Sequence, residues 1–245
     1  MTTLFFVVPA AGRVTLTEVC LRQLSRTCGE LAEKGIQASA VVIADDENLE
    51  TARDVGFATV ERGNECLGAR VNDGFEAAGL EGVDFVITLG SDDWVDASWV
   101  ASFLPAPDVV RCSREMSMVD ETGSRLSTLE LPYAGGHGIR MFPRALLEQA
   151  RFRPAEEFAC RSVDFSILKG LGRAAGHQTR LVYVDDGPFR VVDWKSPVVQ
   201  LTPSESWRRY EHGEPADPFE VLSGFFPAES LDEMAAVYER VAVVV

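Results

Sequence analysis

Two adjacent carboxylates follow an apolar run near the middle of the chain. In VDFVITLGSDDW, Asp92 and Asp93 come directly after Gly90 and Ser91. Neighbouring residues on a strand point to opposite faces, so both carboxylates can act at one site only where the chain has turned off the strand, which Gly90 and Ser91 allow. Carboxylates there suit a hard divalent cation, Mn²⁺ or Mg²⁺, which in turn binds phosphate oxygens. The motif therefore predicts a metal and diphosphate site.

A structural role for the same residues stays open. Asp92 would then cap a helix that begins near Asp96, and Asp93 would be a solvated loop residue. Gly and Asp are also common in loops in general. The two residues alone do not decide between these interpretations.

The first hundred residues predict the scaffold around this motif. Short apolar runs alternate with amphipathic segments of helix length, which is typical of βαβ units and a mostly parallel sheet. We expect strands at residues 4–8, 38–44, 57–61 and 83–89, and helices at residues 15–34, 49–55 and 67–78. Thr15 and Glu18 form a capping box for the first helix. Ligands collect beyond the carboxyl ends of such strands, where residues 9–13, 45–46, 63–64 and 90–93 follow.

The second half of the chain has a different pattern of predicted strands and helices. Residues 109–131 predict strands with a turn at 121–123, and residues 144–150 and 161–171 predict helices. The segment TRLVYVDDGPFRVVDW predicts a hairpin turned at residues 186–187. We expect one domain over residues 1–200, with halves at 1–104 and 105–200, and a C-terminal helical extension over residues 201–245.

Composition limits the partners and the setting. The formal charge of −15, from 38 acidic and 23 basic residues, repels phosphate backbones and argues against nucleic acid. Five cysteines without a C-x-x-C pair argue against a zinc knuckle or a disulfide framework and favour a reducing, cytoplasmic setting. The apolar N-terminal run is about half of the roughly 20 residues that a bilayer span needs, so we expect no membrane anchor.

The motifs, in their order and spacing, resemble those of family 2-like glycosyltransferases with the GT-A fold. The matches are VVPAAGR after the first strand, IADD after the second, ARVNDG on the third helix and LGSDD after the fourth strand. GGHGIRMFPRALLEQARFRP and RSVDFSILKGLG look like the family's acceptor segment and catalytic-base helix. The resemblance covers roughly residues 4 to 195. It implies a Rossmann-like, mostly parallel central sheet flanked by helices, with a nucleotide-binding half followed by an acceptor half.

The resemblance also implies a donor and its contacts. The donor would be a nucleotide-diphospho-sugar, UDP- or GDP-linked. Asp45 or Asp46 would contact its base or ribose, and Arg70 would lie near the diphosphate or orient the metal-site carboxylates. The implied donor-binding residues are Pro9, Ala10, Arg13, Asp45, Asp46, Arg70, Ser91 and Asp92, and the implied metal ligands are Asp92, Asp93 and Asp193.

Transfer to a sugar hydroxyl needs a base, because such a hydroxyl is too weak an acid to attack unassisted at neutral pH. Asp164 matches the family's base, with Glu156 and Glu157 as reserves. Gly136 and His137 of the glycine-rich segment, together with Trp94, are the predicted acceptor contacts. The acceptor itself is open between a glycan, a protein and a small molecule.

The chain departs from the family pattern at particular positions. Gly90 stands where the first Asp of D-x-D is expected, and Val163 replaces the Glu before the base. Asp193 lies one position away from a third metal ligand that is normally His. These departures put the metal affinity and the identity of the base in question.

Two alternatives to an inverting, metal-assisted glycosyltransferase stay open. The departures fit a non-catalytic nucleotide- or carbohydrate-binding protein on a decayed fold. VVPAAGR and GGHGIRMFP also resemble the phosphate loop of sugar nucleotidyltransferases, although the first lacks a second glycine and a lysine, and the second lies far downstream. The C-terminal helices are compatible with a role over the acceptor site or in a homodimer.

Overall fold

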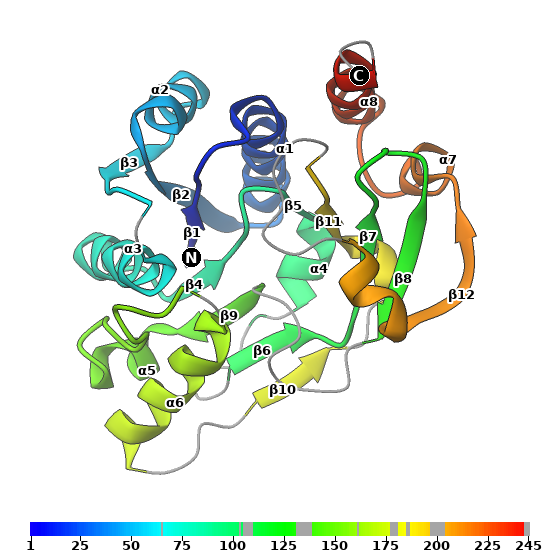
Figure 1. Cartoon of the computed structure of the whole chain (residues 1–245). Helices are drawn as coiled ribbons and strands as arrows, with labels where there is room; N and C mark the ends of the chain where they lie inside the picture. The colour runs from blue at the N-terminus through cyan, green and yellow to red at the C-terminus, as the bar shows by residue number, and fades with distance from the viewer. Residues whose placement is uncertain are drawn as a thin grey trace.

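A seven-stranded sheet forms the centre of the protein (Figure 1). The computed structural model describes residues 1–64, 66–102, 104, 110–130, 139–160, 162–176, 181–184, 187–196 and 204–242. The strands of this sheet are β1 (Thr2–Pro9), β2 (Ile36–Ala44), β3 (Ala58–Glu61), β4 (Phe85–Thr88), β6 (Val110–Ser113), β9 (Arg140–Pro143) and β10 (Leu181–Val184). Their order is β10-β6-β9-β4-β1-β2-β3, and only β9 is antiparallel to its neighbours. The predicted mostly parallel sheet is confirmed.

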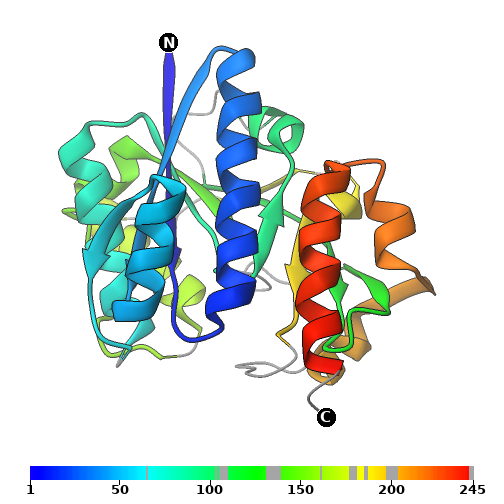
Figure 2. The same cartoon turned by 90° about the horizontal axis from the view of Figure 1, so that it is seen from above.

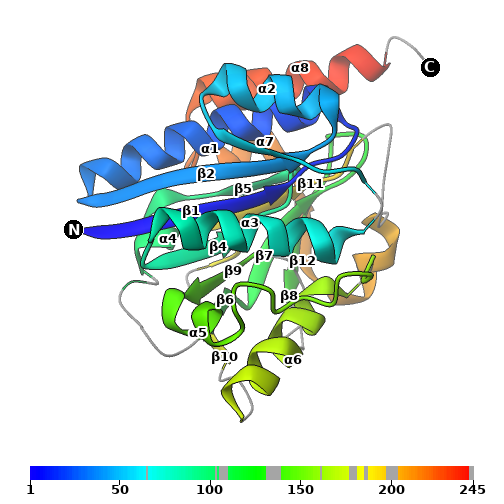
Figure 3. The same cartoon turned by 90° about the vertical axis from the view of Figure 1, so that its left-hand side faces the viewer.

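Helices cover both faces of this sheet (Figure 3). One face carries α1 (Val14–Glu33), α2 (Asp46–Val55) and α4 (Ala97–Ser102), and the other carries α3 (Leu67–Glu81), α5 (Arg144–Gln149) and α6 (Val163–Ala175). Side chains alternate along β1, so Leu4, Phe6 and Val8 pack toward α1 and α2, whereas Phe5 and Val7 pack toward α3, α5 and α6. A strand that is buried on both faces reads as a continuous apolar run, as β1 does.

A second, five-stranded sheet lies beside the N-terminal part of α1. It contains β5 (Asp93–Val95), β7 (Glu115–Val119), β8 (Leu126–Glu130), β11 (Val191–Trp194) and β12 (Glu211–Ala216), in the order β12-β8-β7-β11-β5. The 3-10 helices η1 (Pro188–Arg190) and η2 (Ser204–Tyr210) adjoin it, with α7 (Pro218–Leu222) and α8 (Ala228–Ala242). Figure 2 shows α8 beside α1, and both contribute to one apolar core with this sheet. The expected C-terminal helices are therefore present, together with β12.

Three local predictions are wrong. The hairpin at residues 186–187 does not form, because β10 pairs with β6 in the first sheet and β11 pairs with β5 and β7 in the second. The capping box of α1 does not form, because Arg13 occupies the cap position with a left-handed φ of 53° and no side chain caps the helix. Helix α3 continues past Gly79 and ends at Gly82, whose φ is 71°.

The order of strands creates a switch point at the carboxyl ends of β1 and β4. The chain places β2 and β3 on one side of β1 and then returns to place β4 on the other side. Ligands of open α/β sheets bind in the crevice that forms where the order reverses. Residues 10–13 after β1 and residues 89–93 after β4 occupy this position.

The domain boundary near residue 200, the homodimer and the cytoplasmic setting stay predictions. Among the described residues, no helix combines the length and the apolar character that crossing a membrane requires.

Gly170 on α6 provides a test of how closely α6 packs against the segment before it. A Cβ at this position would collide with the backbone carbonyl oxygen of Pro154. We expect Gly170→Ala to lower the free energy of unfolding by about 1–3 kcal/mol, because backbone atoms must shift to make room. The matched control, Gly29→Ala on α1, meets no atom within 4 Å. It should raise the free energy of unfolding by about 0.5–1 kcal/mol. Urea denaturation measures both, and an unchanged Gly170→Ala protein would contradict the close packing.

Candidate functional site

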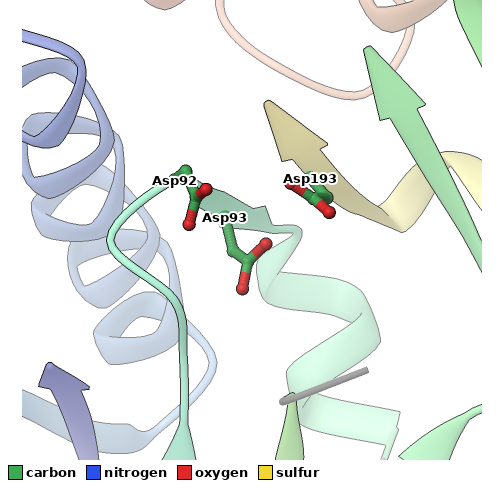
Figure 4. Close-up of side chains that lie close together, drawn as sticks. All are labelled: Asp92, Asp93 and Asp193. Carbon is green, nitrogen blue, oxygen red and sulfur yellow. The ribbon is translucent and has the colours of Figure 1, made fainter. Parts of the chain in front are cut away.

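Three carboxylates meet at the switch point (Figure 4). Asp92 lies on the turn between β4 and β5, Asp93 begins β5, and Asp193 lies on β11; each offers an oxygen within 4.8 Å of the others. Asp93 lies opposite Asp193 in the β5–β11 ladder, and the Trp194 N–H donates to the Asp92 carbonyl oxygen at 2.8 Å. Strand pairing therefore brings residues from distant parts of the sequence into one cluster.

The structural alternative for these carboxylates is wrong. Helix α4 is capped by Asp96, whose carboxylate accepts the Trp99 N–H at 2.9 Å. Asp92 instead accepts a hydrogen bond from Arg13. Asp93 accepts from the Gly90 N–H at 2.8 Å and is largely buried, so it is not a solvated loop residue.

Gly90 leaves room for the carboxylates of this turn. A Cβ at Gly90 would lie 2.5 Å from Oδ2 of Asp93 and 3.0 Å from Oδ1 of Asp92. Any larger side chain, aspartate included, would force these carboxylates to move. The departure from D-x-D at this position therefore has a steric reason within the chain's own geometry.

Two cations compensate part of the negative charge. Arg13 donates through Nη1 to Asp92 and through Nη2 to Ser91 Oγ, the latter at 3.0 Å. Lys195 donates to Asp193 and is buried, and its own carbonyl oxygen accepts from the Tyr238 hydroxyl at 2.8 Å. Sequence analysis did not predict Lys195. The only signal was its place two residues after Asp193.

Burial and crowding raise the pKa values of two members of the cluster. Desolvation raises the pKa of Asp93 well above its usual range, and the charges of Asp193 and Asp92 raise it further. Desolvation also raises the pKa of Asp193, which Lys195 opposes. Oδ1 of Asp193 is buried without a hydrogen-bond partner among the described residues. An all-oxygen cluster with a surplus of negative charge and an unpaired buried oxygen fits a hard divalent cation.

Hydrogen bonds from one side chain connect the loop after β1 to the start of α2. Asn48 donates to the Gly12 carbonyl oxygen and to Oδ1 of Asp45, each at 3.2 Å. Asp45 therefore lies next to the loop that carries Arg13. The side chain of Asp46 falls outside the described residues. Pro9 ends β1, and Ala10 is buried and donates its N–H to the Ile43 carbonyl oxygen at 2.9 Å.

Arg70 holds the ends of the central strands together. Its guanidinium donates to the carbonyl oxygens of Ala10 and Ile43, the latter at 2.6 Å, and to Asn64 Oδ1 at 3.1 Å. Desolvation lowers the pKa of Arg70, and the charge of Asp45 opposes this shift. Arg70 positions the loops at the switch point, and its contact with a diphosphate stays a prediction.

Asp164 lies in the first turn of α6, at the same edge of the sheet. Its Oδ1 is 3.5 Å from Nη1 of the buried Arg140. Arg140 lies opposite Thr88 in the β4–β9 ladder, which places this ion pair at the carboxyl end of β4. Desolvation raises the pKa of Asp164, and Arg140 opposes the shift. Val163, at the position of the family's Glu, is a core residue.

The reserve carboxylates lie at the surface. Glu156 is within 3.9 Å of Lys169 and 4.0 Å of Arg173, and Glu157 pairs with Arg153. Both Glu side chains are about half exposed, at 52% and 50%. The local charges therefore favour Asp164 over either as the buried base.

The predicted acceptor contacts are not supported by the described residues. The predicted contact of Trp94 with the acceptor does not fit its burial. Trp94 is 1% exposed, and its ring centroid lies 5.0 Å from that of Trp194 and 5.1 Å from that of Phe226. A ring enclosed by other rings offers no face to a sugar. Gly136 and His137 fall outside the described residues, so their role stays a prediction.

Comparisons with known proteins bear on the fold. No protein-family model matches the chain, and no curated protein matches it. Two structures of S. aureus TarS, without and with UDP, are similar to it with TM-scores of 0.57 and 0.57 and identities of 16% and 17%. The matches cover 79% and 80% of this chain and 60% and 61% of the TarS chains. A mutant Drosophila beta-1,4-galactosyltransferase 7 in complex with manganese, UDP-Gal and xylobiose has a TM-score of 0.51 and 13% identity, covering 91% of this chain and 79% of that chain.

At these identities the similarity shows the fold, which is of the GT-A type. This confirms the predicted fold class. The chain spans about three fifths of the length of the TarS structures, 60% and 61%. Activity, substrates and partners do not follow from the similarity and must be argued from the site.

The raised pKa of Asp93 predicts how stability depends on pH in the metal-free protein. The folded state binds this proton more tightly than the unfolded chain, so the stabilising contribution is present at low pH and is lost as the pH rises through the folded pKa. Asp93→Asn keeps an oxygen for the Gly90 N–H and removes the charge. At pH 8 in EDTA it should raise the free energy of unfolding by about 1–2 kcal/mol, with a smaller gain at pH 4.

Urea denaturation at the two pH values measures this effect. Asp54→Asn, at an exposed position on α2, is the matched control and should change the free energy of unfolding little. Saturating Mn²⁺ should stabilise the wild-type protein more than Asp93→Asn, because the cation offsets the repulsion. A metal-free Asp93→Asn protein that is less stable than wild type at pH 8 would contradict the crowding of negative charge.

Proposed function

We propose that this protein is an inverting glycosyltransferase that moves a sugar from a nucleotide-diphospho-sugar to an acceptor hydroxyl, with the assistance of a divalent cation. The observation that carries the proposal is the cluster of Asp92, Asp93 and Asp193 at the switch point of a GT-A-type sheet. A UDP-linked donor is consistent with the UDP and UDP-Gal complexes of the two similar proteins. A GDP-linked donor fits the same chemistry.

The three carboxylates would hold Mn²⁺ or Mg²⁺, because both cations prefer oxygen ligands. A bound divalent cation supplies stabilisation of the negative charge that develops on the departing diphosphate. With all side chains ionised, the carboxylates together with Arg13 and Lys195 carry a net negative charge, which would repel a diphosphate. A divalent cation makes the sum positive, so nucleotide binding should depend on metal.

The nucleotide would lie along the carboxyl ends of β1, β2 and β4. Asp45 would accept hydrogen bonds from the base or ribose, and the donor would pass the end of β1 with Pro9 and Ala10 and the turn with Ser91. Asn48 joins Asp45 to the loop after β1. This link would keep the group that binds the base or ribose at a fixed distance from the loop that carries Arg13. This arrangement orients the donor before any chemistry takes place.

Asp164 would remove the proton of the acceptor hydroxyl as it attacks the anomeric carbon on the side opposite the diphosphate. Attack from that side inverts the anomeric configuration. Burial raises the pKa of Asp164, which makes it a stronger base than an ordinary aspartate, and Arg140 keeps its carboxylate oriented and ionised. The acceptor, whether a glycan, a protein or a small molecule, would approach from the side of α6.

The first test is calorimetric titration with UDP, GDP and their common sugar conjugates, with and without Mn²⁺. We expect one nucleotide series to bind, with at least about tenfold weaker affinity in EDTA, because the carboxylates repel the uncompensated diphosphate. Asp92→Ala should remove the metal dependence. Absence of binding by either series would contradict the proposal. Binding without turnover would favour the non-catalytic protein, and pyrophosphate release from a nucleoside triphosphate and a sugar phosphate would favour the nucleotidyltransferase.

The role of Asp164 gives a second prediction. Asp164→Asn should lower kcat by about 10²–10⁴-fold, because the amide cannot accept the hydroxyl proton, while the nucleotide Kd changes less than about twofold. Glu157→Gln is the matched control at an exposed position and should leave kcat near wild type. A near-normal kcat for Asp164→Asn would show that Asp164 is not the base. Loss of activity in Glu157→Gln would assign that role to Glu157 instead.

A further inference from the structure

Arg13 lies between the proposed cation site and the proposed donor site. We propose that Arg13 is an internal counter-ion that a divalent cation displaces from Asp92, and that the displaced guanidinium then binds the donor's diphosphate. This inference rests on the proposed function and adds an exchange of partners to it. Arg13 would thus have two conformations, one paired with Asp92 in the metal-free protein and one paired with the diphosphate when cation and donor are bound.

The first step is that Arg13 and the cation require the same ligand. Nη1 of Arg13 donates to Oδ2 of Asp92, and Asp92 is one of the carboxylates that can hold a metal ion. The side chains of Arg13 and Asp92 are only 11% and 18% exposed, so water screens the site poorly. A guanidinium and a divalent cation on the same carboxylate repel each other strongly in such surroundings. Binding of the cation therefore favours departure of the guanidinium.

The second step is that the guanidinium of Arg13 is held by the turn that carries the carboxylates. Within the part of the chain that the structure describes, it donates to Asp92 and to Ser91, which belong to that one turn. Its backbone carbonyl accepts from the Thr17 N–H at 2.9 Å, which anchors the main chain in the first turn of α1. Rotation about the side-chain bonds can move the guanidinium while the loop stays still.

Lys195 is a contrasting cation in the same cluster. Its backbone N–H donates to the Val119 carbonyl oxygen at 3.0 Å, its carbonyl oxygen accepts from Tyr238 at 2.8 Å, and its ammonium group donates to Asp193. Lys195 follows β11 of the second sheet, whereas Arg13 lies in the loop after β1, where the diphosphate is expected. Of the two cations, Arg13 is therefore the one for which the donor offers a new partner.

The third step is that the displaced guanidinium has an anion within its range. Arg13 follows Gly12 in the loop after β1, where diphosphates bind in sheets of this topology. A guanidinium can donate two parallel hydrogen bonds to phosphate oxygens, which matches the diphosphate better than a single carboxylate oxygen does. The nucleotide thus offers Arg13 a new partner when the cation has taken the old one.

Arg13→Gln tests the exchange, because it should change two affinities in opposite directions. In the full chain, titration with Mn²⁺ alone, followed by the electron paramagnetic resonance signal of free Mn²⁺, should show about tenfold tighter binding than in wild type, since the competing charge is gone. At saturating Mn²⁺, calorimetry should show about tenfold weaker binding of whichever of UDP and GDP the wild-type protein binds. Thermal melting verifies that the variant is folded.

Arg22→Gln is the matched control. It removes the same charge from the same helix, but Arg22 is half exposed and pairs with Glu18 at 2.6 Å. We expect it to change both affinities less than about twofold, because exposed charges are screened. An equal effect of both variants on Mn²⁺ would mean that net charge alone is responsible, which overturns the proposal.

The remaining outcomes are also decisive. Weaker Mn²⁺ binding by Arg13→Gln would mean that Arg13 orients Asp92 for the cation, which overturns displacement. Tighter Mn²⁺ binding with unchanged nucleotide affinity would overturn the contact with the diphosphate. If the wild-type protein binds neither UDP nor GDP in Mn²⁺, the proposed function fails, and with it the contact with the diphosphate, whereas the Mn²⁺ titration still decides whether Arg13 is displaced.

Discussion

The structure depends on keeping three carboxylates together in a largely buried place. Desolvation and mutual repulsion both oppose this arrangement, and they raise the pKa values of Asp93 and Asp193. Arg13, Lys195 and the Gly90 N–H offset part of the cost. The remainder must be carried by a rigid frame, because the carboxylates would separate if the chain around them could relax.

That frame is the junction between the two sheets. Strand β4 belongs to the first sheet and β5 to the second, so residues 89–92 form the passage from one sheet to the other. The chain passes between the sheets again from β5 to β6, from β6 to β7, from β8 to β9 and from β10 to β11. Asp193 on β11 faces the passage because β11 pairs with β5. Both carboxylates fold back over Gly90, so a side chain at this position would displace them.

Local patterns predicted the first half of the fold well, because its signals are local. The apolar run of β1 is buried on both faces, and the alternation of strands and helices follows the βαβ units. The hairpin at residues 186–187 was wrong because VYV and VVDW are equally apolar, and the choice of sheet is made by partners far away in sequence. The capping box was wrong because Arg13, two residues before the predicted cap Thr15, takes the left-handed cap conformation.

The site was predictable to the extent that it follows strand geometry. Asp93 and Trp94 are neighbours on β5, so one points into the site and the other into the core, a signal that would have excluded Trp94 as a sugar contact. Lys195 was missed because its one sequence signal, a place two residues after Asp193, does not by itself predict that its ammonium group meets Asp193. The contact between Arg140 on β9 and Asp164 on α6 also depends on how these two elements pack, and their spacing in the sequence does not predict it.

Strand β4 sets the distance between the two halves of the proposed chemistry. The carboxylate cluster follows β4 directly along the chain, and Arg140, which orients Asp164, lies opposite Thr88 in the ladder with β9. Because register in a sheet advances in whole residues, a slip of one residue between β4 and β9 would turn Arg140 to the opposite face and separate it from Asp164. The antiparallel β9, an exception in an otherwise parallel sheet, therefore places the proposed base at the carboxyl end of β4.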